Sequence, residues 1–249
     1  MLPVSPRWLS EMAGAWPLTR WLATVLAAGM LLVMSTPALA AEITIAPTTA
    51  RIPADADQAT VWLNNQAGKP WRAEAKLYRW RQDGEREVLE PAITATVSPS
   101  QFEIPSQGRQ LLRVIRLGPS PATTEDSYRL VVTQQASAEE PELLRYSIPV
   151  FTLPSQASEA KPKLHAHLLQ SGTERALTLH NAGIGHARLA DLAYIGASGT
   201  RLNIRNDLAG YVLPGQTRRW TLPASLPAGK GRFVARINGD TESTLVLEP

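Results

Sequence analysis

One stretch of the sequence, Leu143–Pro154, limits the folds open to this chain more than any other. Its large apolar residues alternate with polar ones, and this period of two predicts a β-strand. The alternating residues are Leu144, Tyr146, Ile148 and Val150. Pro149 has no N–H to give to a neighbouring strand, so we expect the strand to lie at a sheet edge or to carry a bulge there. Because proteins normally blunt or cover a long apolar edge, we infer that this one stays open for pairing with a strand of another protein.

Short apolar segments separated by glycine, proline and polar turns fill the region before this strand, and helical periodicity is nearly absent. The Asp83–Gly84 pair predicts a hairpin turn. The expected strands cover residues 43–52 (interrupted by Pro47), 59–64, 71–81, 93–97, 110–117 and 127–134. Together with Leu143–Pro154, they make about seven strands in about 110 residues, a number and spacing typical of an immunoglobulin-like sandwich.

A change of composition at Pro154–Lys163, which is rich in serine, alanine, proline and lysine, indicates a domain boundary. A second set of strands is expected beyond it, at residues 164–169, 176–181, 187–195, 218–222, 231–238 and 243–247. The predicted fold class is therefore all-β, with two immunoglobulin-like β-sandwich domains. We expect these domains to span residues 41–154 and 164–249, joined by a linker at 155–163.

The start of the chain has the features of an export signal. A basic segment with Arg7 and Arg20 precedes an apolar run of about 14 residues, and an A-x-A cleavage site ends at Ala40. The run is shorter than a membrane span requires, and no second run follows, so we expect residues 1–40 to be removed and the mature chain not to insert into a membrane. An uncleaved anchor is the alternative interpretation, and Met12 is an alternative start.

The composition and motifs argue against several classes of function. The chain has no cysteine, which excludes thiol chemistry. Its net charge is only +3 and its basic residues are scattered, so we expect no basic patch for nucleic acid. His165 and His167 are spaced for one face of a strand, but no third ligand cluster accompanies them, so we expect no metal and no cofactor. No catalytic motif such as G-x-S-x-G or H-E-x-x-H is present. We therefore expect that the protein is not an enzyme.

A set of short motifs, in a characteristic order, runs through almost the whole expected mature chain. They are TARI at 49–52, ATVWLNNQ at 59–66, QLLRVIRL at 110–117, VFTLP at 150–154, LHNAG at 179–183, YVLPGQTRRW at 211–220 and RINGD at 236–240. In these motifs the chain resembles the periplasmic pilus chaperones of the chaperone–usher pathway. Tyr128–Leu130 and Ile148–Phe151 look more like the archaic branch of that family, whose clients are similar to spore coat protein U subunits.

The resemblance implies two sandwiches in a boomerang arrangement, a periplasmic location and transfer of pilus subunits to an outer-membrane usher. It also implies donor-strand complementation, in which a subunit lacking its last strand borrows an edge strand of the chaperone. The donor residues would be Leu144, Tyr146, Ile148 and Val150. Each such apolar side chain contributes about 1.5–3 kcal/mol when fully buried. A free chaperone with an exposed edge of this kind is also a candidate for self-capping as a dimer.

In the family's main branch, an arginine on the first strand and a lysine on the last strand of the first domain hold the C-terminal carboxylate of the subunit. Arg51 matches the arginine, but the lysine position falls near Pro149. Arg129, expected on the strand that pairs with the donor strand, is the candidate replacement, with Arg145 behind it. The alternative for these arginines is an ordinary structural or solvated role.

A second hypothesis of function is a structural or adhesive immunoglobulin-like protein that itself joins a surface assembly. Such a subunit would lack a strand and carry a free N-terminal extension. The first expected strand begins at Ile43, almost directly after the cleavage site, and this favours the chaperone hypothesis.

Overall fold

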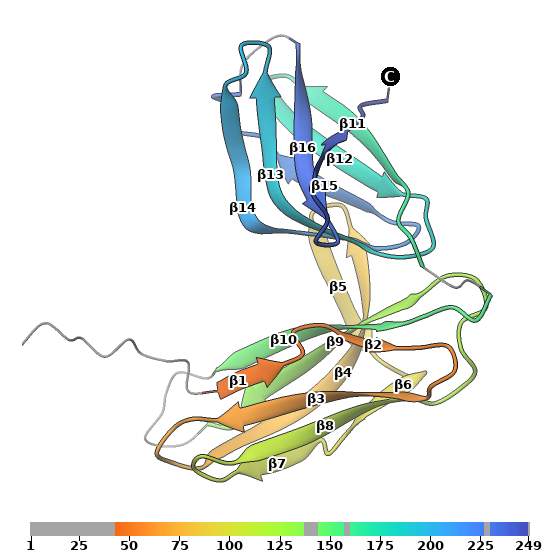
Figure 1. Ribbon diagram of the computed structural model, residues 1–249, viewed down its shortest axis with the longest axis vertical. Helices are drawn as coiled ribbons and strands as arrows, with labels where there is room; N and C mark the ends of the chain where they lie inside the picture. The colour runs from red at the N-terminus through yellow and green to blue at the C-terminus, as the bar shows by residue number, and fades with distance from the viewer. Residues whose placement is uncertain (1–42, 137–143, 157–159, 227–229, 249) are drawn as a thin grey trace, which may run out of the picture. The chain divides into compact units, whose positions relative to one another are not determined.

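The computed structural model describes residues 43–136, 144–156, 160–226 and 230–248. Within these residues the regular structure consists of β-strands, which form four sheets arranged as two sandwiches (Figure 1). The expected all-β fold class is confirmed. None of the described residues belongs to a helix with the length and apolar character needed to cross a membrane. The expected export signal lies outside the described residues.

The first sandwich is formed by two sheets, here called sheet A and sheet B. In spatial order, sheet A contains β1 (Ile43–Ala46), β3 (Gln58–Asn65), β8 (Arg109–Arg116) and β6 (Ala95–Ser98). Sheet B contains β2 (Ala50–Ile52), β10 (Arg145–Thr152), β9 (Asp126–Gln134), β4 (Trp71–Asp83) and β5 (Arg86–Pro91), with β7 (Gln101–Ile104) also paired to β4. The chain passes from sheet A to sheet B around Pro47, which divides the expected strand 43–52 into β1 and β2.

Alternation of apolar residues along the strands builds the core of this sandwich. Val61 and Leu63 of β3 are fully buried, whereas Trp62 between them is partly exposed. On β4, the face that carries Leu77 enters the core, but Trp80 on the opposite face is also buried. Trp80 is covered by residues of the second sandwich, and sheet B is therefore covered on both faces at this point.

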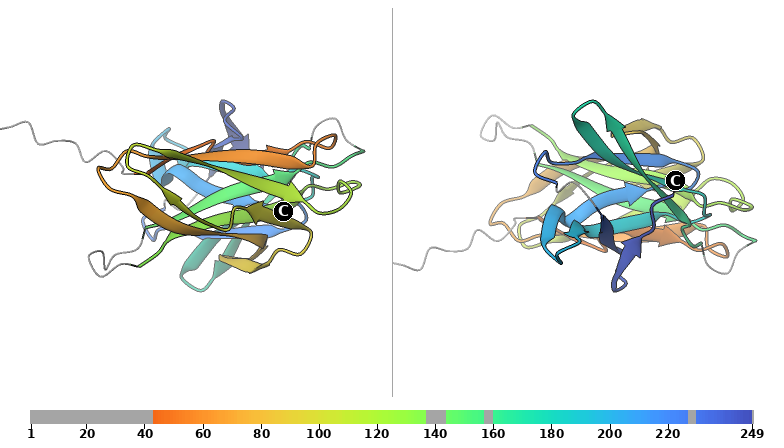
Figure 2. Two further views of the ribbon diagram at one scale, coloured as in Figure 1. Left: turned by 90° about the horizontal axis from the view of Figure 1, so that it is seen from below. Right: turned by 90° about the horizontal axis from the view of Figure 1, so that it is seen from above.

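The second sandwich begins at β11 and also has two sheets, whose strands fill the rest of the described chain (Figures 1 and 2). One contains β11 (Leu164–Ser171), β12 (Glu174–Asn181) and β15 (Thr217–Thr221); the other contains β14 (Arg201–Val212), β13 (Ala187–Gly196), β16 (Gly231–Ile237) and β17 (Glu242–Leu245). Strand β14 was not expected, because its sequence is mostly polar and lacks a steady alternation. Its pairing with β13 is irregular, and Asp207 and Gly210 have positive φ angles of 54° and 138°.

Asn181 and the loop after it hold the chain that enters the second sandwich. The buried Asn181 side chain accepts hydrogen bonds from the N–H groups of Lys163 and Gly183 and donates to the carbonyl oxygens of Gly185 and Val212. A Cβ atom at Gly183 or Gly185 would collide with the backbone of residues 160–163, so only glycine allows this close approach. The LHNAG motif therefore fixes the exit of the linker.

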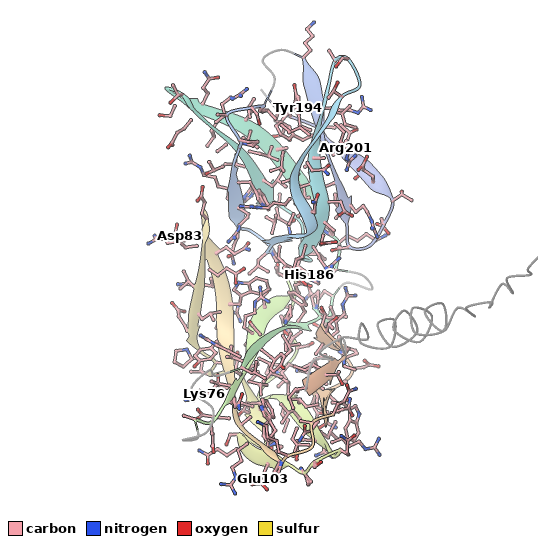
Figure 3. All side chains as sticks on the ribbon, turned by 90° about the vertical axis from the view of Figure 1, so that its left-hand side faces the viewer. Lys76, Asp83, Glu103, His186, Tyr194 and Arg201 are labelled. Atoms are coloured by element: carbon pink, nitrogen blue, oxygen red, sulfur yellow. The ribbon has the colours of Figure 1, made fainter. Side chains whose placement is uncertain are left out.

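The β4–β5 hairpin forms where the Asp83–Gly84 pair predicted it, with Gly84 and Glu85 between the two strands, and its tip contacts the second sandwich. Gly84 forms a bridge with Arg218 of β15. The side-chain amide of Gln82 donates to the Tyr211 carbonyl oxygen (2.8 Å) and accepts from the Leu213 N–H (3.0 Å). Figure 3 shows Asp83 at this tip.

Candidate functional site

Strand β10 is paired along its whole length on one side and only partly on the other. It pairs antiparallel with β9 from Arg145 to Thr152, but β2 joins its other side only at Val150–Thr152. Among the described residues, no strand covers Arg145–Pro149 on that side. The expected edge strand is therefore confirmed for this half, while the other half lies between two strands.

Two hydrogen bonds define which backbone groups point toward the open side. The Gln134 N–H of β9 donates to the carbonyl oxygen of Leu144, just before β10, at 2.9 Å. The Leu153 N–H, just after β10, donates to the Ile52 carbonyl oxygen of β2, also at 2.9 Å. Because backbone groups alternate in direction along an antiparallel strand, odd-numbered residues face away from β9. The open edge thus offers the N–H groups of Arg145 and Ser147, while Pro149 has none to offer. This placement explains how a proline is tolerated here.

The four predicted donor side chains form a gradient of burial along β10. Leu144 is 39% exposed and Tyr146 is half-buried, whereas Ile148 is 5% exposed and Val150 is fully buried. Tyr146 packs edge-to-face on Trp71, with ring centroids 6.2 Å apart. The first two side chains are therefore accessible to a partner, and the last two belong to the chain's own core.

The open part of β10 lies close to the free side of β1. The Tyr146 hydroxyl donates to the Ile43 carbonyl oxygen at 3.5 Å, and Ile45 of β1 is only partly buried against the same core. Among the described residues β1 pairs only with β3, so it forms an edge of sheet A. Both sheets of the sandwich therefore end on the same side, with an apolar interior between them.

The three predicted anchor arginines share one face of sheet B. Arg51 is paired with Phe151, Arg129 with Pro149 and Arg145 with Thr133. Paired residues of neighbouring strands point to the same face, and all three arginines therefore lie on the outer face, opposite the core. Arg51 and Arg145 are exposed, and neither has a side-chain hydrogen bond or ion pair within the described part of the chain.

Arg129 lies on the strand that pairs with β10, as predicted, but its environment was not foreseen. Its side chain is 11% exposed, and its Cζ atom lies 3.7 Å from the centre of the Trp80 ring. Its Nη2 atom is 3.3 Å from each carboxylate oxygen of Glu87 on β5. Burial lowers the pKa of Arg129, and the charge of Glu87 partly opposes this effect. Glu87 was missed because no strand was expected at residues 86–91.

The outer face of sheet B also carries the contact with the second sandwich. Trp80, Phe151, Tyr211 and Leu213 form one buried apolar cluster. The ring of His186 (Figure 3) stacks on that of Phe151, with ring centroids 3.6 Å apart. The backbone N–H and the Nδ1 atom of His186 contact Glu125 Oε1, at 2.6 and 2.8 Å. Sequence reasoning gave His186 no role, because nothing in the sequence indicates its pairing with Glu125. The end of β10 is thus held by the second sandwich.

His165 and His167 share one carboxylate partner, Glu248. The His165 Nδ1 atom contacts Glu248, and the His167 Nε2 atom lies 3.6 Å from its Oε2. The Glu248 N–H also donates to the Ala166 carbonyl oxygen at 2.8 Å. These contacts attach the C-terminal segment to β11. In the described ranges, no group of three or more histidine or acidic residues is arranged to hold a metal ion.

Comparison with known proteins agrees with this architecture. Residues 42–158 match the family described as the pili and flagellar-assembly chaperone, PapD N-terminal domain. No match was found among curated proteins. The chain aligns with the chaperone in the CsuC–CsuE chaperone–tip adhesion subunit pre-assembly complex from the archaic chaperone–usher Csu pili of Acinetobacter baumannii. The identity is 25%, the TM-score is 0.66, and the alignment covers 82% of this chain and 97% of that one.

Two further solved chaperones share the fold at lower identity. The Escherichia coli chaperone DraB aligns at 17% identity with a TM-score of 0.58, covering 83% of this chain and 96% of DraB. The Pseudomonas aeruginosa chaperone CupB2 aligns at 20% identity with a TM-score of 0.55, covering 81% and 97%. Both alignments span the two sandwiches.

The first sandwich thus matches the PapD N-terminal domain family, and the two-sandwich fold is similar to that of these solved pilus chaperones.

Proposed function

We propose that the chain is a periplasmic pilus-assembly chaperone of the chaperone–usher pathway. We further propose that it binds incomplete pilus or coat-like subunits by donor-strand complementation at the open half of β10. The observation that carries this proposal is the uncovered edge at Arg145–Pro149, flanked by accessible apolar side chains at Leu144 and Tyr146. A client strand placed there would gain backbone hydrogen bonds with Arg145 and Ser147. Apolar side chains of the client strand would enter the space between β10 and β1, so that one hydrophobic core would extend through both proteins.

We also propose how the client strand ends. Strand β2 begins at Ala50, opposite Val150, and blocks further extension along β10. A client strand that runs parallel to β10 therefore brings its C-terminal carboxylate to this point, beside Arg51 and Arg129 on the outer face, whereas Arg145 lies five residues back along β10. A hydrogen bond from a charged arginine to that carboxylate would contribute about 1.5–3 kcal/mol. Arg51 is the foremost candidate, because its guanidinium is exposed and unpaired in the described structure.

The archaic branch is the proposed family branch, because the 25% identical structure comes from an archaic Csu system. We therefore propose that the clients resemble spore coat protein U subunits and pass to an outer-membrane usher. We further propose that residues 1–40 are a cleaved signal peptide, with the domains divided as expected from the sequence, and that a second copy caps the open edge when no client is bound.

Co-expression with candidate subunits from the same locus, followed by purification, tests the proposal. The expected result is a stable one-to-one complex that Leu144→Asp and Ser147→Pro each abolish without unfolding the chaperone. Ser147→Pro removes an N–H that points to the open edge and leaves the pairing with β9 intact. Subunits that stay soluble without this chain, or complexes that survive both variants, would contradict donor-strand binding at this edge.

A further inference from the structure

Three of the four histidines of the chain lie on the outer face of one sheet of the second sandwich. His165 and His167 are two residues apart on β11, and His180 on β12 is the direct pairing partner of His165. Ala166, between the first two, is buried in the core, so the side chains on either side of it point outward. No third ligand lies near His165 and His167 in the sequence, but the pairing of β11 with β12 supplies one.

The three imidazoles are close together and accessible to solvent. The ring centroids of His165 and His180 are 6.4 Å apart. The side chains of His165 and His167 are 27% and 40% exposed, and His180 is also partly exposed. Glu248 adds a carboxylate, which contacts His165 Nδ1 and whose Oε2 lies 3.6 Å from His167 Nε2. Three imidazoles and one carboxylate therefore share one small area of the surface.

Two of the rings already have one nitrogen held by a polar partner. His180 Nδ1 contacts Thr217 Oγ1 at 3.1 Å, and His165 Nδ1 contacts the Glu248 carboxylate. Such a partner fixes the orientation of the ring and leaves the other nitrogen for a metal, as is usual for metal-bound histidine.

In the described structure these side chains do not surround one point, because His165 and His167 both turn toward Glu248. Directly paired residues, such as His165 and His180, have Cβ atoms about 4.5–5.5 Å apart. Rotation of the partly exposed side chains can therefore bring the ring nitrogens around one ion without a change in the strands.

We propose that His165, His167 and His180 bind a divalent transition-metal ion of the zinc type, with the Glu248 carboxylate as the fourth ligand. Zinc takes three imidazole nitrogens and one oxygen in a tetrahedral arrangement. Imidazole selects ions of this type, whereas Mg²⁺ and Ca²⁺ require oxygen ligands. Binding releases any proton held on the coordinating nitrogens. The ion would join β11, β12 and the C-terminal segment. The site lies away from β10, so this inference does not depend on the proposed client binding.

Calorimetric titration of zinc chloride into residues 41–249, purified without a histidine tag, tests the site. The expected result is one ion per chain with a Kd below about 10 µM, and no binding in the same titration with magnesium chloride. Zinc should also raise the thermal midpoint in a concentration-dependent way, because the ligands come together only in the folded chain.

Variants on β11 and β12 identify the ligands. His167→Gln and His180→Gln should each weaken zinc binding at least about tenfold, because each removes one nitrogen ligand. Leu169→Gln is the matched control, since Leu169 is exposed on the same face of β11, two residues beyond His167. It should keep the wild-type affinity. The thermal midpoint of each variant without zinc shows whether its fold is intact.

Nuclear magnetic resonance of the imidazole rings gives a second measurement, which needs no variant. Zinc should shift the ring signals of the three site histidines and leave those of His186 unchanged, because His186 is buried against Glu125 elsewhere in the fold. No binding of zinc overturns the proposal, as does an unchanged affinity in His167→Gln or His180→Gln. One ion per two chains would show that the ion joins two molecules, and it would overturn a site within one chain.

Discussion

Substitutions at Leu144 and Ile148 should separate the proposed client binding from the stability of the chain. Both residues were predicted to enter the client, but Leu144 is 39% exposed and Ile148 only 5%. Full burial of such a side chain contributes about 1.5–3 kcal/mol. The exposed share of Leu144 therefore corresponds to about 0.6–1.2 kcal/mol of client affinity, or about a three- to eightfold change in Kd. For Ile148 the corresponding share is about 0.1 kcal/mol.

Stability should respond in the opposite order. Ile148→Ala would leave a cavity in the core of the first sandwich and should cost about 2–4 kcal/mol of unfolding free energy. Leu144→Ala should change it by less than about 0.5 kcal/mol, as at most accessible positions. Chemical denaturation measures stability, and titration with a purified client strand peptide measures affinity. The reasoning is refuted if Leu144→Ala leaves the affinity unchanged, or if Ile148→Ala weakens binding more than it weakens the fold.

Three further predictions concern other parts of the molecule. Arg51→Ala should abolish recovery of the client complex without lowering the thermal midpoint, because the exposed Arg51 has no partner to lose within the described chain; normal recovery would remove it from the anchor. Glu125→Ala should destabilise the chain by about 1–3 kcal/mol for each buried His186 donor left unpaired, which urea denaturation measures. A hydrogen bond from Arg201 lowers the pKa of Glu242 below 4.5, so this pair stabilises the fold above that value and the stabilisation is lost as the pH falls through the lowered pKa. The small difference in thermal midpoint between wild type and Arg201→Gln at neutral pH should therefore vanish near about pH 2.

The sequence predicted the features that depend on local pattern. The period of two in Leu143–Pro154 identified a strand, and the missing N–H of Pro149 placed it at an edge, as the pairing of β10 shows. The Asp83–Gly84 turn was predicted in the same way. These features follow from the chemistry of one segment, and no knowledge of the rest of the fold is required.

Features that depend on distant partners were not predictable. Burial of Ile148 and Val150 depends on the core residues of the other strands that pack against them, which the alternation in β10 does not encode. The contact of Glu125 with His186, and of Arg129 with Glu87, joins residues far apart in the sequence. Strand β5 was missed for a local reason, since its sequence REVLEP is too short and too polar to show a clear period.

Hydrogen exchange at two amides tests the central claim most directly. In the free protein, the N–H groups of Arg145 and Ser147 face the open edge, whereas those of Tyr146 and Ile148 face β9. In a complex with a client subunit, exchange at Arg145 and Ser147 should slow by at least about a hundredfold, while Tyr146 and Ile148 stay protected in both states. Unchanged exchange at Arg145 and Ser147 in a stable complex would show that the client binds elsewhere.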